Sequence, residues 1–295
     1  MRNKIVTSVL GGITLALIAA TSFDAKSDVV PYSAIPQDQA EFISTSAHIV
    51  SVAVSGAPMA IWETLEHGEK VECIDCVNAV APLIYDQNAR TREISVWWMR
   101  RRMFGVFGPG EVYSQTLKTL AGDADPQRRA FAAYAIGEFL EGTGVAALAT
   151  ALKDADPRVR GAAASGLARL DDDGAGALSL TFTDADESVR LAGIAGAGRI
   201  NSFTDAAGVS RLVGDSSAFV RRRAIMLLDQ MQTKDAVASV LALAQKDGDA
   251  EVRLVACHAL GSFGDPSAKG ILASIAQNDA NLQVRDQAQI ALRRL

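Results

Sequence analysis

Aromatic residues, cysteine and histidine are all scarce in this sequence. Aromatic side chains make up 6% of its 295 residues, and there are only three cysteines and three histidines. Three cysteines are too few for a fold held together by a disulfide framework. An excess of positive charge is also lacking. The formal net charge of −5 disfavours nucleic acid as the main partner, because phosphate binding requires a broad basic surface. The hydrophobic content of 49% excludes a largely disordered chain.

Motifs for catalysis and metal binding are missing as well. His48, His67 and His258 are not paired with any cysteine or serine motif of known catalytic spacing. Cys257 lies far along the chain from the other two cysteines, so the sequence predicts no zinc site. We therefore expect that the protein is not an enzyme and holds neither a metal nor a cofactor.

Long apolar runs are absent after the first 25 residues. Arg2 and Lys4 precede an apolar run at residues 5–20, which is followed by small residues up to Ala25. This arrangement predicts a secretory signal peptide at residues 1–25, cleaved near residues 20–25. The run is shorter than the roughly 20 residues of a stable membrane span, and a retained anchor is the alternative. We expect an exported protein, either periplasmic or secreted.

What the sequence does contain is an internal repeat. Segments similar to Asp-Ala-Asp-Pro-Arg-Val-Arg at 154–160 recur every 30–32 residues and end in arginine. An aspartate lies six residues before each arginine, and a helix-capping residue lies four residues before it. The aspartate and arginine pairs of the clear copies are Asp123 and Arg129, Asp154 and Arg160, Asp184 and Arg190, Asp215 and Arg221, Asp247 and Arg253, and Asp279 and Arg285. A weaker copy ends at Arg92.

The residues around each arginine predict a pair of helices. Small side chains recur three positions after it, and mostly apolar ones seven and ten positions after it, which places them on one helical face. Another apolar segment precedes each aspartate. The sequence therefore predicts an all-α protein with about seven helix pairs over residues 73–295. Residues 26–72 fall outside the clear repeat and are expected to form an N-terminal helical cap, with helices at 37–55 and 61–67.

The aspartate, the turn and the arginine resemble the HEAT-repeat family, in particular the short bacterial repeats related to those of phycobilisome lyases. The resemblance covers residues 75–295. It implies a right-handed α-solenoid in which the second helix of each pair lines a concave face. It also implies that the aspartates and arginines above form a structural ladder between units. A lyase-like or cofactor-handling maturation protein is one alternative that it leaves open, although the metal-binding His-Glu pairs of HEAT-repeat hydroxylases are missing.

The side chains expected on the concave face are small or apolar. If the apolar stripe is buried, the position five residues after each arginine points away from it. The residues there are Trp97, Tyr134, Ser165, Ala195, Met226 and His258. Such a trough is suited to a helix or an extended peptide of a protein partner, which favours a scaffold or assembly factor. The alternative is that the alanines merely reflect helix propensity.

Cys73 and Cys76 form a Cys-x-x-Cys motif at the start of the first helix pair. In an exported protein this spacing predicts a local disulfide. A thiol-redox function and unpaired thiols are the alternatives. Valine at position 77 excludes attachment of a c-type haem, which requires histidine there. Cys257 is predicted to be an inert buried thiol.

The densest charged cluster consists of Arg100, Arg101 and Arg102, which follow two tryptophans. Three consecutive arginines span about 200° of a helix, so at least one must face solvent. They are expected either to bind an anionic partner, such as a membrane surface, or to extend into water while the tryptophans pack beneath the cap. The glycine-rich residues 104–110 are predicted to be a loop.

Overall fold

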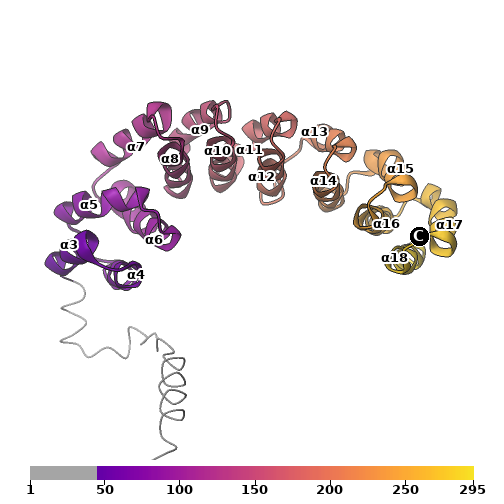
Figure 1. Cartoon of the computed structure of the whole chain (residues 1–295), viewed down its shortest axis with the longest axis horizontal. Coiled ribbons are helices and arrows are strands. Elements are labelled where there is room, and N and C mark those ends of the chain that lie inside the picture. Colours follow the sequence, from indigo (N-terminus) through magenta and orange to yellow (C-terminus); the bar gives the residue numbers. More distant parts are fainter. Residues whose placement is uncertain (1–44) are drawn as a thin grey trace, which may run out of the picture.

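The computed structural model describes residues 45–295, which form helices and connecting turns without any strand. The helices are arranged as an arch with two layers (Figure 1). The inner, concave layer contains α6 (Ala89–Arg100), α8 (Pro126–Glu138), α10 (Pro157–Arg169), α12 (Glu187–Ala197), α14 (Ala218–Gln230), α16 (Ala250–Phe263) and α18 (Leu282–Leu292). The outer layer contains α5 (Ile74–Val80), α7 (Gly110–Gly122), α9 (Val145–Ala151), α11 (Asp172–Leu178), α13 (Ala206–Arg211), α15 (Val237–Lys246) and α17 (Lys269–Asn278).

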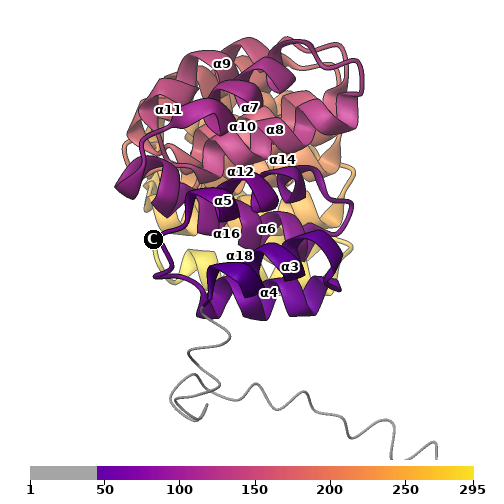
Figure 2. The ribbon, with the colours of Figure 1, turned by 90° about the vertical axis from the view of Figure 1, so that its left-hand side faces the viewer.

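These fourteen helices form seven consecutive pairs, so the expectation of an all-α solenoid is confirmed. Another pair, α3 (Ser46–Ser55) and α4 (Pro58–His67), lies at the N-terminal end of the arch. In the view from that end, α3 and α4 lie in front of the C-terminal helices (Figure 2). The predicted signal peptide and residues 26–44 of the predicted cap lie outside the described residues. Within residues 45–295, no helix combines the length and the apolar character that a membrane span requires.

The inner helices begin where the repeat predicts. The capping side chain accepts a hydrogen bond from a backbone N–H of the first turn in every one of them, which satisfies a donor that the helix itself leaves free. The caps are Asn88, Asp125, Asp156, Asp186, Ser217, Asp249 and Asn281. Proline occupies the first helical position at 126 and 157, where its missing N–H has no cost.

Small residues allow neighbouring inner helices to approach closely. A Cβ atom added to Gly137 of α8 would lie 2.4 Å from the Cα atom of Gly166 in α10. A Cβ atom added to Gly261 of α16 would lie 2.7 Å from the Cα atom of Ala291 in α18. In both contacts, the residue eight positions after one repeat arginine lies against the residue six positions after the next repeat arginine. Because the same positions meet in both places, successive inner helices run parallel and in register.

The N-terminal region corrects the prediction for Arg102. A π-helix at Arg101–Val106 follows α6, and the backbone N–H of Phe107 donates to the Arg102 carbonyl at 2.6 Å. Arg102 is only 1% exposed, because its guanidinium turns inward to four backbone carbonyls and lies 3.6 Å from the Trp98 ring centroid. It is therefore unavailable to an anionic partner. The expectation of a loop throughout residues 104–110 is also wrong, since the π-helix extends to Val106.

Candidate interaction surface

The turns of successive units are joined by a ladder of ion pairs. In each rung, the Nε and Nη2 atoms of an arginine donate to both carboxylate oxygens of the aspartate in the next unit. The Nε to Oδ2 distances are 2.7–2.8 Å. The five rungs are Arg129–Asp154, Arg160–Asp184, Arg190–Asp215, Arg221–Asp247 and Arg253–Asp279. Each of these arginines also donates through Nη1 to the backbone carbonyl of the aspartate in its own unit. The ladder thus fixes the register of the inner helices.

The rung aspartates remain ionised because of these contacts. The hydrogen bonds from Arg129 and Arg253 lower the pKa values of Asp154 and Asp279. At Asp184, Asp215 and Asp247, burial alone would raise the pKa, but hydrogen bonds from the arginine and a backbone N–H outweigh it and the pKa is lowered.

Two of the twelve predicted ladder residues do not form rungs. The carboxylate of Asp123 pairs with Arg128 of its own unit at 3.0 Å, while Arg92 of the preceding unit stacks 3.9 Å from the Phe131 ring centroid. Arg285 donates to the Asp279 carbonyl at 2.6 Å and has no carboxylate partner among the described residues. The ladder therefore runs from Arg129 to Asp279.

The concave face does not bring the predicted contact residues into one cluster. Trp97, Tyr134, Met226 and His258 lie on α6, α8, α14 and α16, one on each helix. Trp97 and Tyr134 are half-buried, and burial raises the pKa of Tyr134 to about 12. Met226 is 46% exposed. His258 is exposed, with its Nε2 atom 3.6 Å from the carboxylate of Asp229.

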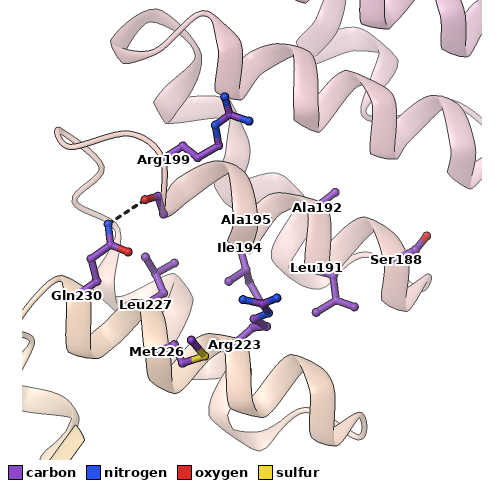
Figure 3. A pocket seen from close by; sticks show the side chains of 11 residues that line it. Ser188, Leu191, Ala192, Ile194, Ala195, Arg199, Arg223, Met226, Leu227 and Gln230 are labelled. Carbon is purple, nitrogen blue, oxygen red and sulfur yellow. Dashed lines mark hydrogen bonds between the residues drawn. The ribbon is translucent and has the colours of Figure 1, made fainter. Parts of the chain in front are cut away.

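A groove opens on this face between α12 and α14 (Figure 3). It has a volume of about 600 Å³. Its walls are mostly apolar and include Leu191, Ala192 and Ala195 from α12 and Met226 and Leu227 from α14. At one end, the side-chain amide of Gln230 donates to the Gly198 carbonyl at 2.8 Å and joins the two helices.

The groove has a local cause in the sequence. The other clear copies of the repeat have a small residue six positions after the arginine, namely Ala135, Gly166, Gly196, Ala259 and Ala291. Gly166, Gly196 and Ala291 lie against the preceding inner helix. In α14 this position is Leu227, whose side chain lines the groove beside Gly198. A bulky residue there prevents the close approach that the other pairs make. Comparing this position across the repeats would have located the groove from the sequence.

Two exposed arginines, Arg199 and Arg223, also line the groove. Neither has a carboxylate within 4.0 Å among residues 45–295. Arg169, which occupies the position of Arg199 in the preceding inner helix, donates to Glu138 at 2.6 Å. The neighbouring Arg222 lies 5.1 Å from the Phe219 ring centroid. This face of α14 therefore combines unpaired positive charge with Phe219, which is 60% exposed.

Arg100 and Arg101 provide little for an anion site. Arg100 is half-buried, and Arg101 lies 3.5 Å from the carboxylate of Glu69. With Arg102 buried and Arg100 half-buried, Arg101 is the one exposed residue of the three, and it already faces an acidic residue.

Two of the three cysteines form a disulfide, and the third is a buried thiol. Cys73 and Cys76 form a disulfide at the start of α5. The Cys73 sulfur also accepts a hydrogen bond from the Cys76 backbone N–H at 3.1 Å. Cys257 is fully buried, and burial raises the pKa of its thiol to about 12. No group of His, Cys, Asp and Glu within the described part of the chain is arranged to hold a metal ion.

Comparison with known proteins identifies the repeat. Residues 114–197 and 206–293 match the family model described as HEAT repeats. No curated protein matches the sequence. Among solved structures, YibA of Escherichia coli is similar, with 14% identity over 88% of this chain and 96% of that chain and a TM-score of 0.56. Kap95p in its complex with RanGDP shares 10% identity over 97% of this chain and 43% of its own length, with a TM-score of 0.60. The CpcE–CpcF complex of phycocyanin lyase from Nostoc sp. PCC7120 shares 19% identity over 73% of this chain and 86% of that chain, with a TM-score of 0.39.

Proposed function

The chain belongs to the HEAT-repeat family, and from this premise we propose that it is an exported scaffold or assembly factor. It binds another protein along its concave face and catalyses no reaction itself. The observation that carries the proposal is the groove between α12 and α14, where apolar side chains remain exposed on the inner layer. The apolar run behind Arg2 and Lys4 supports export.

Energetics favour protein binding at this groove. On the inner helices α8, α10, α12, α14 and α16, two large apolar side chains stay more than one-third exposed, Met226 in the groove and Phe219 seven residues before it on α14. Covering them removes apolar surface from water, which contributes about 25 cal/mol for each Å² buried. Exposed apolar patches rimmed by polar groups are typical of protein interaction sites. A solenoid bound to another protein also occurs in the Kap95p complex, although that similarity concerns the fold alone.

The first experiment is native mass spectrometry of the protein isolated from its own cell envelope. The proposal expects the mass of the processed chain plus that of a second polypeptide. Photocrosslinking from position 226 should then yield the same polypeptide, whereas crosslinking from position 180 in the outer layer should not. Leu180 is a matched control because it is apolar and 57% exposed.

Substitutions then test the concave face directly. Met226→Asp places a charge in the apolar groove and should abolish capture of the partner, and Tyr134→Asp tests the same face on α8. Leu180→Asp should leave capture intact. Unchanged capture by the Met226→Asp variant would refute binding at the groove. Added mass from a small molecule instead of a polypeptide would favour the cofactor-handling alternative.

A further inference from the structure

We propose that the groove between α12 and α14 binds an amphipathic α-helix with two acidic residues about two turns apart. This inference rests on the proposed function and specifies the chemistry of its partner. The groove combines an apolar wall, which includes Leu191, Ala195 and Met226, with two exposed arginines. Arg223 lies beside Met226, whereas Arg199 lies at the edge of the groove with its guanidinium directed away from α14 (Figure 3).

The charge of the groove selects an acidic partner. The whole chain is acidic, with a formal net charge of −5, yet this part of the inner face has two arginines without a carboxylate among the described residues. Elsewhere on the inner layer, Arg169 is neutralised by Glu138 and the arginines of the five rungs by their aspartates, whereas Arg92 stacks on Phe131 and Arg285 donates to a backbone carbonyl. Carboxylates on the partner would complement the two free guanidinium groups, which favours correct over incorrect partners.

The groove favours a helix over an extended segment. Its walls are helices whose backbone groups are already hydrogen-bonded within each helix, so it offers no strand edge with which an extended peptide could pair. An extended peptide would bury unpaired N–H and C=O groups against the apolar wall, whereas a helix satisfies these groups internally.

The register of the repeat gives the spacing of the two acidic residues. Arg223 lies two residues after its ladder arginine, and Arg199 lies nine residues after the ladder arginine of α12. Arg199 follows the last turn of α12, and the inner helices run parallel and in register, so the backbone positions of the two arginines differ by about seven residues, or about 10 Å, along the helix axes. Two glutamates at positions i and i+7 of a bound helix span the same distance, and apolar residues at i+3 and i+4 between them would face the wall.

The test uses a fluorescein-labelled helical peptide with glutamate at i and i+7 and leucine at i+3 and i+4. Its affinity for the full chain is measured by fluorescence anisotropy at low salt. Matched peptides carry glutamine or lysine in place of both glutamates. We expect the glutamate peptide to bind about tenfold more tightly than the glutamine peptide, and its advantage to shrink as the ionic strength rises.

Charge reversal on the protein provides the second arm. Arg199→Glu and Arg223→Glu should each weaken binding of the glutamate peptide by about tenfold, and the double variant should prefer the lysine peptide. Arg211→Glu is the matched control, because Arg211 is an exposed arginine of the outer helix α13. Equal binding of the glutamate and glutamine peptides, or equal effects of Arg199→Glu and Arg211→Glu, would overturn the inference.

Two further outcomes separate this inference from the proposed function. If Met226→Asp abolishes binding of the peptide while the arginine variants do not, the acidic helix is wrong but binding at the groove stands. If Met226→Asp changes neither peptide binding nor partner capture, the proposed function fails as well. Sedimentation with phosphatidylglycerol vesicles that depends on Arg199 and Arg223, without peptide binding, would assign the groove to lipid and overturn the inference.

Discussion

Replacing Arg102 with methionine should destabilise the N-terminal end of the solenoid by about 3 kcal/mol. The guanidinium donates to the carbonyls of Gly68, Glu69, Val71 and Trp98 at 2.6–3.2 Å. It thereby attaches the segment after α4 to the end of α6. Burial, together with the neighbouring Arg101, lowers the pKa of Arg102 to about 10, so it is still a cation at neutral pH.

The expected loss of stability follows from the backbone carbonyls that lose the hydrogen bonds of Arg102. Each buried carbonyl left without a donor costs about 1–3 kcal/mol. The Gly68 carbonyl still accepts from Trp98 Nε1 and from the Val71 N–H, and water reaching the partly exposed segment at residues 69–71 recovers some of the remaining cost. The desolvation of the buried cation is also removed, which offsets a further part. Methionine fills most of the space that the arginine side chain occupies, so the lost hydrogen bonds dominate over a cavity.

The assay is urea unfolding followed by circular dichroism, with Arg101→Met as the matched control. Arg101 is the preceding residue, its side chain is 46% exposed, and it should contribute less than about 1 kcal/mol. We expect the Arg102→Met midpoint to fall by about 1 M urea and the control midpoint to remain close to that of the wild type. Hydrogen exchange should accelerate first at residues 68–73. Equal midpoints for the two variants would refute the reasoning.

Four further predictions concern the repeat and the cysteines. Arg190→Ala strands a buried carboxylate and should cost about 3 kcal/mol in urea unfolding, whereas the exposed Arg158→Ala should cost less than about 1 kcal/mol. The rung aspartates have lowered pKa values when folded, so their contribution is complete above the unfolded value of 3.8; urea midpoints should fall as pH decreases through the folded values. Leu140 adopts a φ of 56° and its side chain is exposed, so Leu140→Gly should raise the melting temperature by a few degrees, and a lower melting temperature would contradict this reasoning. A thiol reagent under non-reducing conditions should label no cysteine in the native protein and Cys257 alone after unfolding; three labelled thiols would exclude the disulfide.

The repeated turn was predictable because its chemistry is local. The caps such as Asp125 and Asp156 lie within a few residues of the amides they bind, so their spacing in the sequence specifies the start of each inner helix. The ladder joins neighbouring units, and the regular 30–32-residue interval places each arginine beside the next aspartate. The first copy breaks this interval, since Arg92 precedes Arg129 by 37 residues, and the rung is absent there.

The direction of the Arg102 side chain and the groove between α12 and α14 could not be predicted, because both depend on contacts that the spacing of residues in the sequence does not determine. The direction of Arg102 is determined by a π-helix and by carbonyls more than 30 residues earlier, at Gly68 and Val71. Counting residues around an ordinary helix showed that some arginine must face solvent, but not which one. The groove depends on the separation of α12 and α14, and the bulky Leu227 is the residue in the sequence that indicates this separation. The bulk of Leu227 is evident only when the same position is compared across the clear copies of the repeat.

The ladder has a consequence for how this molecule can change in length. Each rung joins one unit to the next, and no rung reaches beyond its neighbour. A duplicated unit inserted between two others would carry its own aspartate and arginine and could complete a rung on each side. Gain or loss of whole units would therefore lengthen or shorten the arch while leaving the remaining joints intact. Recombination within the gene can in this way alter the span of the concave face without requiring a new core.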